Sequence, residues 1–245
     1  MKGGCVSFII NISEKMKICA FIGSYDKTDM LTYIAKILNL LNKKVIIIDS
    51  TVLQKSKYII PKMPSGKQFI TTYEGIDIAI GFENAAQVKA YQTSIGGGTF
   101  DYDFALIDID SSRGYKSYGI KPTDMHYFVS TLDIYCLKRG LQVLKHLEKP
   151  VDVTKVLFSK NMAKSENEYV DFISKEIKIK WKEETIFFPF ENGDQTTIYA
   201  NQRTGRISIQ GLSQQYIENI MYITEEISEI SPSSIKKAIK IIDRN

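Results

Sequence analysis

Residues 17–51, KICAFIGSYDKTDMLTYIAKILNLLNKKVIIIDST, decide the fold of this chain. The stretch begins with an apolar run, Ile18 to Ile22, and closes with a second, Val45 to Ile48, that runs into Asp49. Each run has the length and composition of a buried strand. The segment between them places apolar residues at the i, i+3, i+4 and i+7 spacing of one helix face: Leu31, Ile34, Ala35, Leu38 and Leu41. The stretch therefore predicts a strand–helix–strand unit.

The loop from Gly23 to Thr28 leads into this predicted helix. Free backbone N–H groups and the positive end of the helix dipole favour an anion at such a place. Lys27 is a candidate ligand for β- and γ-phosphates, and the Thr28 hydroxyl is a candidate Mg²⁺ ligand. The loop nevertheless departs from the GxxxxGK[ST] pattern of ordinary phosphate-binding loops.

A second apolar strand, Tyr102 to Asp108, also ends in a carboxylate. In a parallel sheet such a carboxylate emerges at the carboxyl edge, where it can reach Mg²⁺ beside the phosphate-binding loop. Asp108 is therefore the second candidate Mg²⁺ ligand, together with Thr28.

These stretches resemble the ParA/MinD family of P-loop ATPases, whose loop reads KGGxGK[ST]. That family carries a Leu-Ala pair seven and eight residues after the loop lysine, and Ile34-Ala35 stands at that spacing from Lys27. The resemblance runs from residue 17 to residue 230. It implies an α/β fold with a doubly wound, mostly parallel sheet flanked by helices, and it divides the chain into an extension (1–16), the P-loop domain (17–230) and a tail (231–245).

Four positions depart from the family pattern in this register. Ser24 replaces the second glycine of the loop, Ile22 the signature lysine that crosses a dimer, and Asp26 the glycine before the loop lysine. Thr51 stands where the family has a second acidic residue. A carboxylate 4 Å from a phosphate charge costs roughly 4 kcal/mol at an effective dielectric constant of about 20, or nearly three decades in affinity. We therefore expect weak nucleotide binding and slow hydrolysis at best.

The resemblance also implies a set of nucleotide-site residues. In the family, an asparagine just after a later strand contacts adenine. Ser159 stands at that position in this chain, and Asn161 lies two positions further on. Pro189 belongs to a turn that is part of the family's pattern. No residue is assigned a catalytic role. The full set of candidate ligands for ATP is Gly23, Ser24, Tyr25, Asp26, Lys27, Thr28, Asp49, Asn161 and Pro189, with Thr28 and Asp108 for Mg²⁺.

Composition bounds the class of protein. The chain has 245 residues, 44% hydrophobic and 24% charged, which fits one soluble α/β domain. Its net charge of +4 does not by itself imply binding to nucleic acid or membrane. The three cysteines form no paired motif, which argues against a zinc site and favours a reducing cytoplasm. The Ile, Lys and Asn content suggests an AT-rich bacterium.

Three segments have more than one interpretation. Residues 1–16 are an extra edge strand, a disordered leader or the product of an upstream start that precedes Met16. Residues 178–182, lysines around Trp181, are either a solvated strand edge or a nucleic-acid contact. Residues 231–245 predict a basic amphipathic helix. A similar helix of MinD binds membranes, but we expect this one to dock on the core. Residues 52–68 read as a surface loop.

The resemblance points to the TadZ/CpaE-like subgroup, whose members have damaged loops and act as localisation adaptors for pilus or secretion machines. The first hypothesis is a dimeric scaffold with weak or no ATP hydrolysis that binds a protein partner. The second is an active ATPase for plasmid or chromosome partition that binds DNA when ATP is bound. The third is a protein that binds no nucleotide, with Asp26 paired to Lys27.

Overall fold

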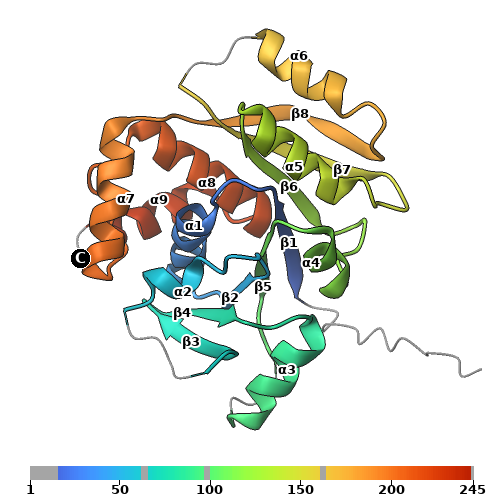
Figure 1. Ribbon diagram of the computed structural model, residues 1–245. Coiled ribbons are helices and arrows are strands. Elements are labelled where there is room, and N and C mark those ends of the chain that lie inside the picture. Colours follow the sequence, from blue (N-terminus) through green and yellow to red (C-terminus); the bar gives the residue numbers. More distant parts are fainter. Residues whose placement is uncertain (1–15, 62–65, 97–99, 161–163, 244–245) are drawn as a thin grey trace, which may run out of the picture.

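The computed structural model describes residues 16–61, 66–96, 100–160 and 164–243. One eight-stranded sheet runs through the molecule in the order β3-β4-β2-β5-β1-β6-β7-β8 (Figure 1). Its strands are β1 (Lys17–Ile22), β2 (Val45–Asp49), β3 (Phe69–Tyr73), β4 (Ile76–Ile80), β5 (Phe104–Ile109), β6 (Met125–Thr131), β7 (Val151–Phe158) and β8 (Ile179–Phe188). All neighbours pair in parallel except β3 and β4, so the predicted fold class is confirmed.

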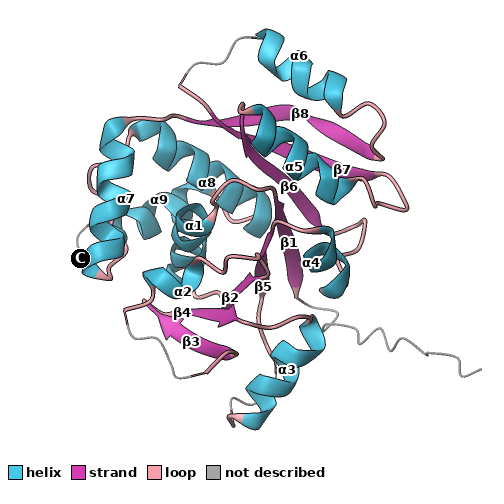
Figure 2. Ribbon diagram, in the orientation of Figure 1, coloured by secondary structure: helices cyan, strands magenta, loops and turns pink. Residues whose placement is uncertain are grey.

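Helices cover both faces of the sheet (Figure 2). They are α1 (Thr28–Leu40), α2 (Ser56–Ile59), α3 (Ala85–Ser94), α4 (Ser112–Ser117), α5 (Ile134–Leu144), α6 (Lys164–Ile173), α7 (Asn192–Thr204), α8 (Gln214–Ser228) and α9 (Pro232–Ile242). Side chains alternate between the faces along each strand. In β1, Cys19 and Phe21 pack in the core with α1 and α8, whereas Ile18, Ala20 and Ile22 pack in the core with α5.

Most predicted elements are present, and the segment after β2 is the main difference. Residues 52–68 contain the short helix α2, and β3 follows directly. Strand β3 pairs antiparallel with β4 through the two-residue turn Glu74-Gly75, whose φ angles are 52° and 83°. Positive φ at both positions is typical of a tight hairpin turn.

The two charged segments whose roles were open are part of the folded domain. Ile235, Ala238 and Ile242 of α9 are at most 2% exposed and pack in the core with α1 and α8, as expected for docking of the tail. Strand β8 forms one edge of the sheet, so Lys180 and Lys182 lie on a solvated strand edge. No helix in the described ranges is long and apolar enough to cross a bilayer.

Candidate functional site

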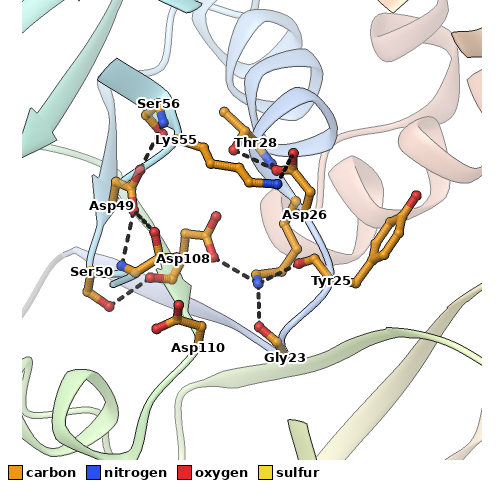
Figure 3. A network of polar contacts seen from close by, with 12 residues as sticks. Gly23, Tyr25, Asp26, Thr28, Asp49, Ser50, Lys55, Ser56, Asp108 and Asp110 are labelled. Carbon is orange, nitrogen blue, oxygen red and sulfur yellow. Dashed lines mark hydrogen bonds and ion pairs between the residues drawn. The ribbon is translucent and has the colours of Figure 1, made fainter. Parts of the chain in front are cut away.

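The candidate site lies at the carboxyl edge of the central strands. The parallel register places Asp49 of β2 directly beside Asp108 of β5, and Ile22, the last residue of β1, beside Ile109. The loop from Gly23 to Lys27 therefore begins next to both carboxylates. Figure 3 shows the loop and the ends of β2 and β5 converging on one polar network.

Gly23 fixes where the loop leaves the sheet. Its φ of 153° is unfavourable for other residues, and a Cβ there would collide with the carbonyl oxygen of Val129 on β6. Its N–H donates to the Ile109 carbonyl at 2.9 Å. The packing of the sheet therefore accounts for this glycine without reference to a phosphate.

The ammonium group of Lys27 is enclosed by the chain's own oxygen atoms. Its Nζ lies 2.7 Å from the Gly23 carbonyl oxygen, 3.0 Å from that of Tyr25 and 2.9 Å from Oδ1 of Asp108. The lysine side chain is 2% exposed and that of Asp108 is 3% exposed. An ammonium has three donors. Two hydrogen bonds and one ion pair therefore enclose the ammonium, and the side chain folds back onto its own loop.

Asp26 occupies the donors at the start of α1. Its Oδ1 accepts from the Thr28 N–H at 3.1 Å and the Thr28 hydroxyl at 2.8 Å, and its Oδ2 forms an ion pair with Lys55 at 3.0 Å. Burial opposes ionisation of Asp26, but Lys55 and the Thr28 donors outweigh it and lower the pKa of this carboxyl. A carboxylate thus stands where a helix N-terminus favours an anion.

Two details differ from the sequence-based expectation for Asp26. The residue has no positive φ, so an aspartate fits this position without backbone strain. The pairing of Asp26 with Lys27 in the third hypothesis is wrong, because Asp26 pairs with Lys55 and Lys27 pairs with Asp108. The loop carries two separate ion pairs that tie it to β5 and to the segment after β2.

The two strand-end carboxylates also have internal partners. Burial raises the pKa of Asp108 to about 7, although the Lys27 ammonium acts in the opposite direction. The carboxylate of Asp49 accepts from the N–H and hydroxyl of Thr51 and from the N–H of Ser56. Asp49 therefore organises the segment that leads into α2.

Two of the remaining predicted nucleotide ligands, Ser24 and Tyr25, line the same cavity as Asp108, but their side chains have partners elsewhere. The Ser24 hydroxyl donates to the Cys136 carbonyl at 3.1 Å. The Tyr25 side chain points away from Asp108 (Figure 3), and its ring lies 4.6 Å from that of Phe158. Pro189 is buried where β8 ends, and Asn161 lies outside the described residues.

The space left in the site is small. The cavity lined by the loop, Thr51, Lys55 and Asp108 has a volume of about 70 Å³. Pockets for drug-sized ligands have volumes of about 300–1,000 Å³. The cavity is too small for ATP with Mg²⁺ in this arrangement, and the Lys27 ammonium and the Thr28 hydroxyl already have partners. Asp108 differs from them, because Lys27 is its ion-pair partner but its buried Oδ1 accepts no hydrogen bond.

Several contributors to this network were not predicted. Lys55 pairs with Asp26, Ser50 donates from its N–H and hydroxyl to the Asp108 carbonyl, and Asp110 accepts from the Val52 N–H. The lysine-rich composition of residues 52–68 was a signal for a cation near the loop, but no sequence spacing links Lys55 to Asp26.

Comparison with known proteins shows the fold. No protein-family model matches the chain, and no curated protein matches its sequence. The MinD cell division protein of Aquifex aeolicus superposes with a TM-score of 0.56 at 14% identity, over 88% of this chain and 98% of that one. A variant of McdA of Cyanothece, solved as an ATP complex, gives 0.54 at 12% identity, over 89% and 98%.

A ParA family ATPase of Chlorobium tepidum gives a TM-score of 0.53 at 10% identity, over 91% of this chain and 98% of that one. Each likeness covers nearly the whole of the compared protein. At these identities the likeness establishes a shared fold, the P-loop fold of ParA and MinD proteins, and function is a separate question.

Proposed function

We propose that this chain is a ParA/MinD-like protein whose nucleotide site has become structural, and that it acts as a dimeric localisation or assembly scaffold with weak or no ATP hydrolysis. The observation that carries the proposal is that the lysine of the loop and the donors of Thr28 are held by the chain's own oxygen atoms. Lys27 is held by Asp108 and two carbonyl oxygens, and Asp26 holds both donors of Thr28. Contacts that would bind a ligand instead hold the loop against the sheet.

A comparison of charges supports this proposal. In a nucleotide-binding loop, the lysine and the helix N-terminus face a phosphate. Here carboxylates take that role, because Asp108 balances the charge of Lys27 and Asp26 caps the N-terminus of α1. A triphosphate would have to draw Lys27 away from Asp108 and displace Asp26 from the Thr28 donors, and it would then lie close to the Asp26 carboxylate. Repulsion between such charges amounts to roughly 4 kcal/mol per pair at 4 Å and an effective dielectric constant of about 20.

The surface beside the site supports dimerisation through this face. Val52 and Leu53, in the segment after β2, are 76% and 64% exposed, and Tyr58 of α2 is 75% exposed. Neighbouring exposed apolar side chains of this kind mark interaction surfaces more often than isolated ones do. The subgroup with damaged loops, the TadZ/CpaE-like adaptors of pilus or secretion machines, fits a scaffold that pairs with a second copy and recruits another protein.

The dimer is tested by light scattering coupled to size-exclusion chromatography. Leu53→Asp should convert a dimer to a monomer, because a charge replaces an apolar contact. Ile95→Asp is the matched control, since Ile95 is 55% exposed at the end of α3 and outside this face. A wild-type monomer at all concentrations, or equal effects of both variants, would contradict the proposed dimer face.

The second candidate function is an ATPase for plasmid or chromosome partition that binds DNA. One observation favours it: Lys27, Thr28 and Asp108 line the same cavity, as they would in a working site. Steady-state hydrolysis with and without DNA separates the candidates. The scaffold proposal expects weak turnover or none, and no stimulation of turnover by DNA. DNA-stimulated turnover that Thr28→Ala removes would establish the ATPase instead.

A further inference from the structure

A second cavity lies on the other side of Asp110, between the β5–α4 turn and helix α5. Its volume is about 260 Å³, and its walls are Asp110, Ser111, Ser112 and a row of residues from the second half of α5 and the turn after it: Arg139, Gln142, Val143, Lys145 and His146. It is more than three times the volume of the cavity at the P-loop.

The walls of this cleft are rich in hydrogen-bond donors. Arg139 and Lys145 bring permanent positive charges, and Ser111, Ser112 and His146 bring further polar hydrogens. The carboxylate of Asp110 is turned toward the segment after β2, where it accepts from the Val52 N–H at 3.0 and 3.2 Å. Donors on facing walls are the arrangement that an oxyanion needs.

The cations of the cleft have no carboxylate partners in the described part of the chain. Arg139 donates from Nη1 to Oε1 of Gln142 at 3.1 Å, which orients its guanidinium along the helix. Neither Arg139, Lys145 nor His146 forms an ion pair within the described ranges. Elsewhere on the surface many cations do pair, as Lys44 does with Asp101 and Arg113 with Glu83.

The helix dipole accounts for part of this pattern. Lys145 and His146 follow the last turn of α5, where positive charges interact favourably with the dipole. The dipole does not explain Arg139 earlier in the helix, nor the serine hydroxyls on the opposite wall. Arginine and lysine together suit the three terminal oxygens of a phosphate group better than a single carboxylate.

We propose that this cleft binds the phosphate group of a small phosphorylated molecule, with Arg139 and Lys145 as the principal ligands and the serine hydroxyls as further donors. The site is separate from the P-loop and does not depend on whether nucleotide binds there. Its volume suits a phosphate monoester with a few additional atoms.

Calorimetric titration with glycerol 3-phosphate, at constant ionic strength, tests this proposal. The wild-type chain should bind one equivalent, and Arg139→Gln and Lys145→Gln should each weaken binding about tenfold, which corresponds to 1.4 kcal/mol. Lys138→Gln is the matched control, because Lys138 is an exposed neighbour on α5 outside the cleft. Its affinity should stay within about twofold of the wild type. Circular dichroism confirms that each variant is folded.

Two results would overturn the proposal. The first is the absence of saturable binding, or binding that the two cleft variants leave unchanged. The second is binding of a nucleic-acid phosphate in place of a small molecule, which is tested with a duplex oligonucleotide. Binding of the duplex that weakens in Arg139→Gln and Lys145→Gln, with no binding of glycerol 3-phosphate, would assign the cleft to a nucleic-acid backbone and refute a small-molecule site.

Discussion

Replacing Lys27 by methionine tests whether this lysine serves the fold. Methionine keeps an unbranched apolar stem in the space of the lysine side chain but removes its charge. The change leaves the buried Asp108 carboxylate without its cation and two carbonyl oxygens without a donor. Removing one partner of a buried ion pair costs about 3–5 kcal/mol. That is a large share of the roughly 5–15 kcal/mol by which domains are stable.

The free energy of unfolding should be measured by urea denaturation at pH 8. Burial raises the pKa of Asp108 to about 7 in the wild type, with Lys27 acting in the opposite direction, so at pH 8 most of the wild-type carboxyl is ionised and the ion pair that the variant removes is present. Lys55→Met is the control, since Lys55 is 48% exposed and its ion pair with Asp26 should contribute less than about 1 kcal/mol.

A double variant, Lys27→Met with Asp108→Leu, removes both charges and should recover much of the loss, because apolar replacements of whole buried pairs are often neutral. A structural role for Lys27 is refuted if Lys27→Met unfolds within about 1 kcal/mol of the wild type, or loses no more than Lys55→Met does.

Three further predictions use the same urea assay. Gly23→Ala should lower the free energy of unfolding by about 2–5 kcal/mol, because its Cβ collides with the Val129 carbonyl oxygen and its φ is strained. Gly119→Ala is the control, with a positive φ but open space around it, and should lower the free energy of unfolding by about 1 kcal/mol. Ile235→Asp, at a fully buried position of α9, should lower the free energy of unfolding by at least about 4 kcal/mol. Its control, Lys236→Glu at an exposed position, should lower it by less than about 0.5 kcal/mol. Equal losses in the two variants would contradict docking of the tail. Burial raises the pKa of Asp29 to about 6, above its unfolded value near 3.9, so its stabilising contribution is complete below about pH 4 and is lost as the pH rises through 6. The stability of the wild type minus that of Asp29→Asn should therefore fall between about pH 4 and pH 6.5; a constant difference would contradict the raised pKa.

The central part of the fold could be predicted because its strands are continuous apolar runs. Strands β1, β2 and β5 are buried on both faces, so Ile18–Ile22 and Phe104–Ile107 carry no polar interruptions. Strand β3, Phe69–Tyr73, was missed because it is a short edge strand with two threonines, after a segment rich in lysine and proline. Its signal was the Glu74-Gly75 turn.

The candidate site was predictable in position and not in its contacts. Two carboxylates at the ends of neighbouring parallel strands must meet at one edge, so Asp49 and Asp108 follow from the topology. The direction of the Lys27 side chain does not follow from the topology, because it depends on which buried oxygen atoms lie within reach after the chain has folded. The pairing of Asp26 with Lys55 joins residues 29 positions apart through a segment without regular periodicity.

Titration of the chain with ATP and Mg²⁺, beside the variant Asp26→Gly, tests most directly whether the nucleotide site has become structural. The variant removes the carboxylate that caps α1 and frees both donors of Thr28. We predict no saturable binding of ATP to the wild type at micromolar concentrations and a gain of at least about tenfold in affinity, or 1.4 kcal/mol, for Asp26→Gly. Micromolar binding by the wild type that Asp26→Gly leaves unchanged would contradict a structural role for this site.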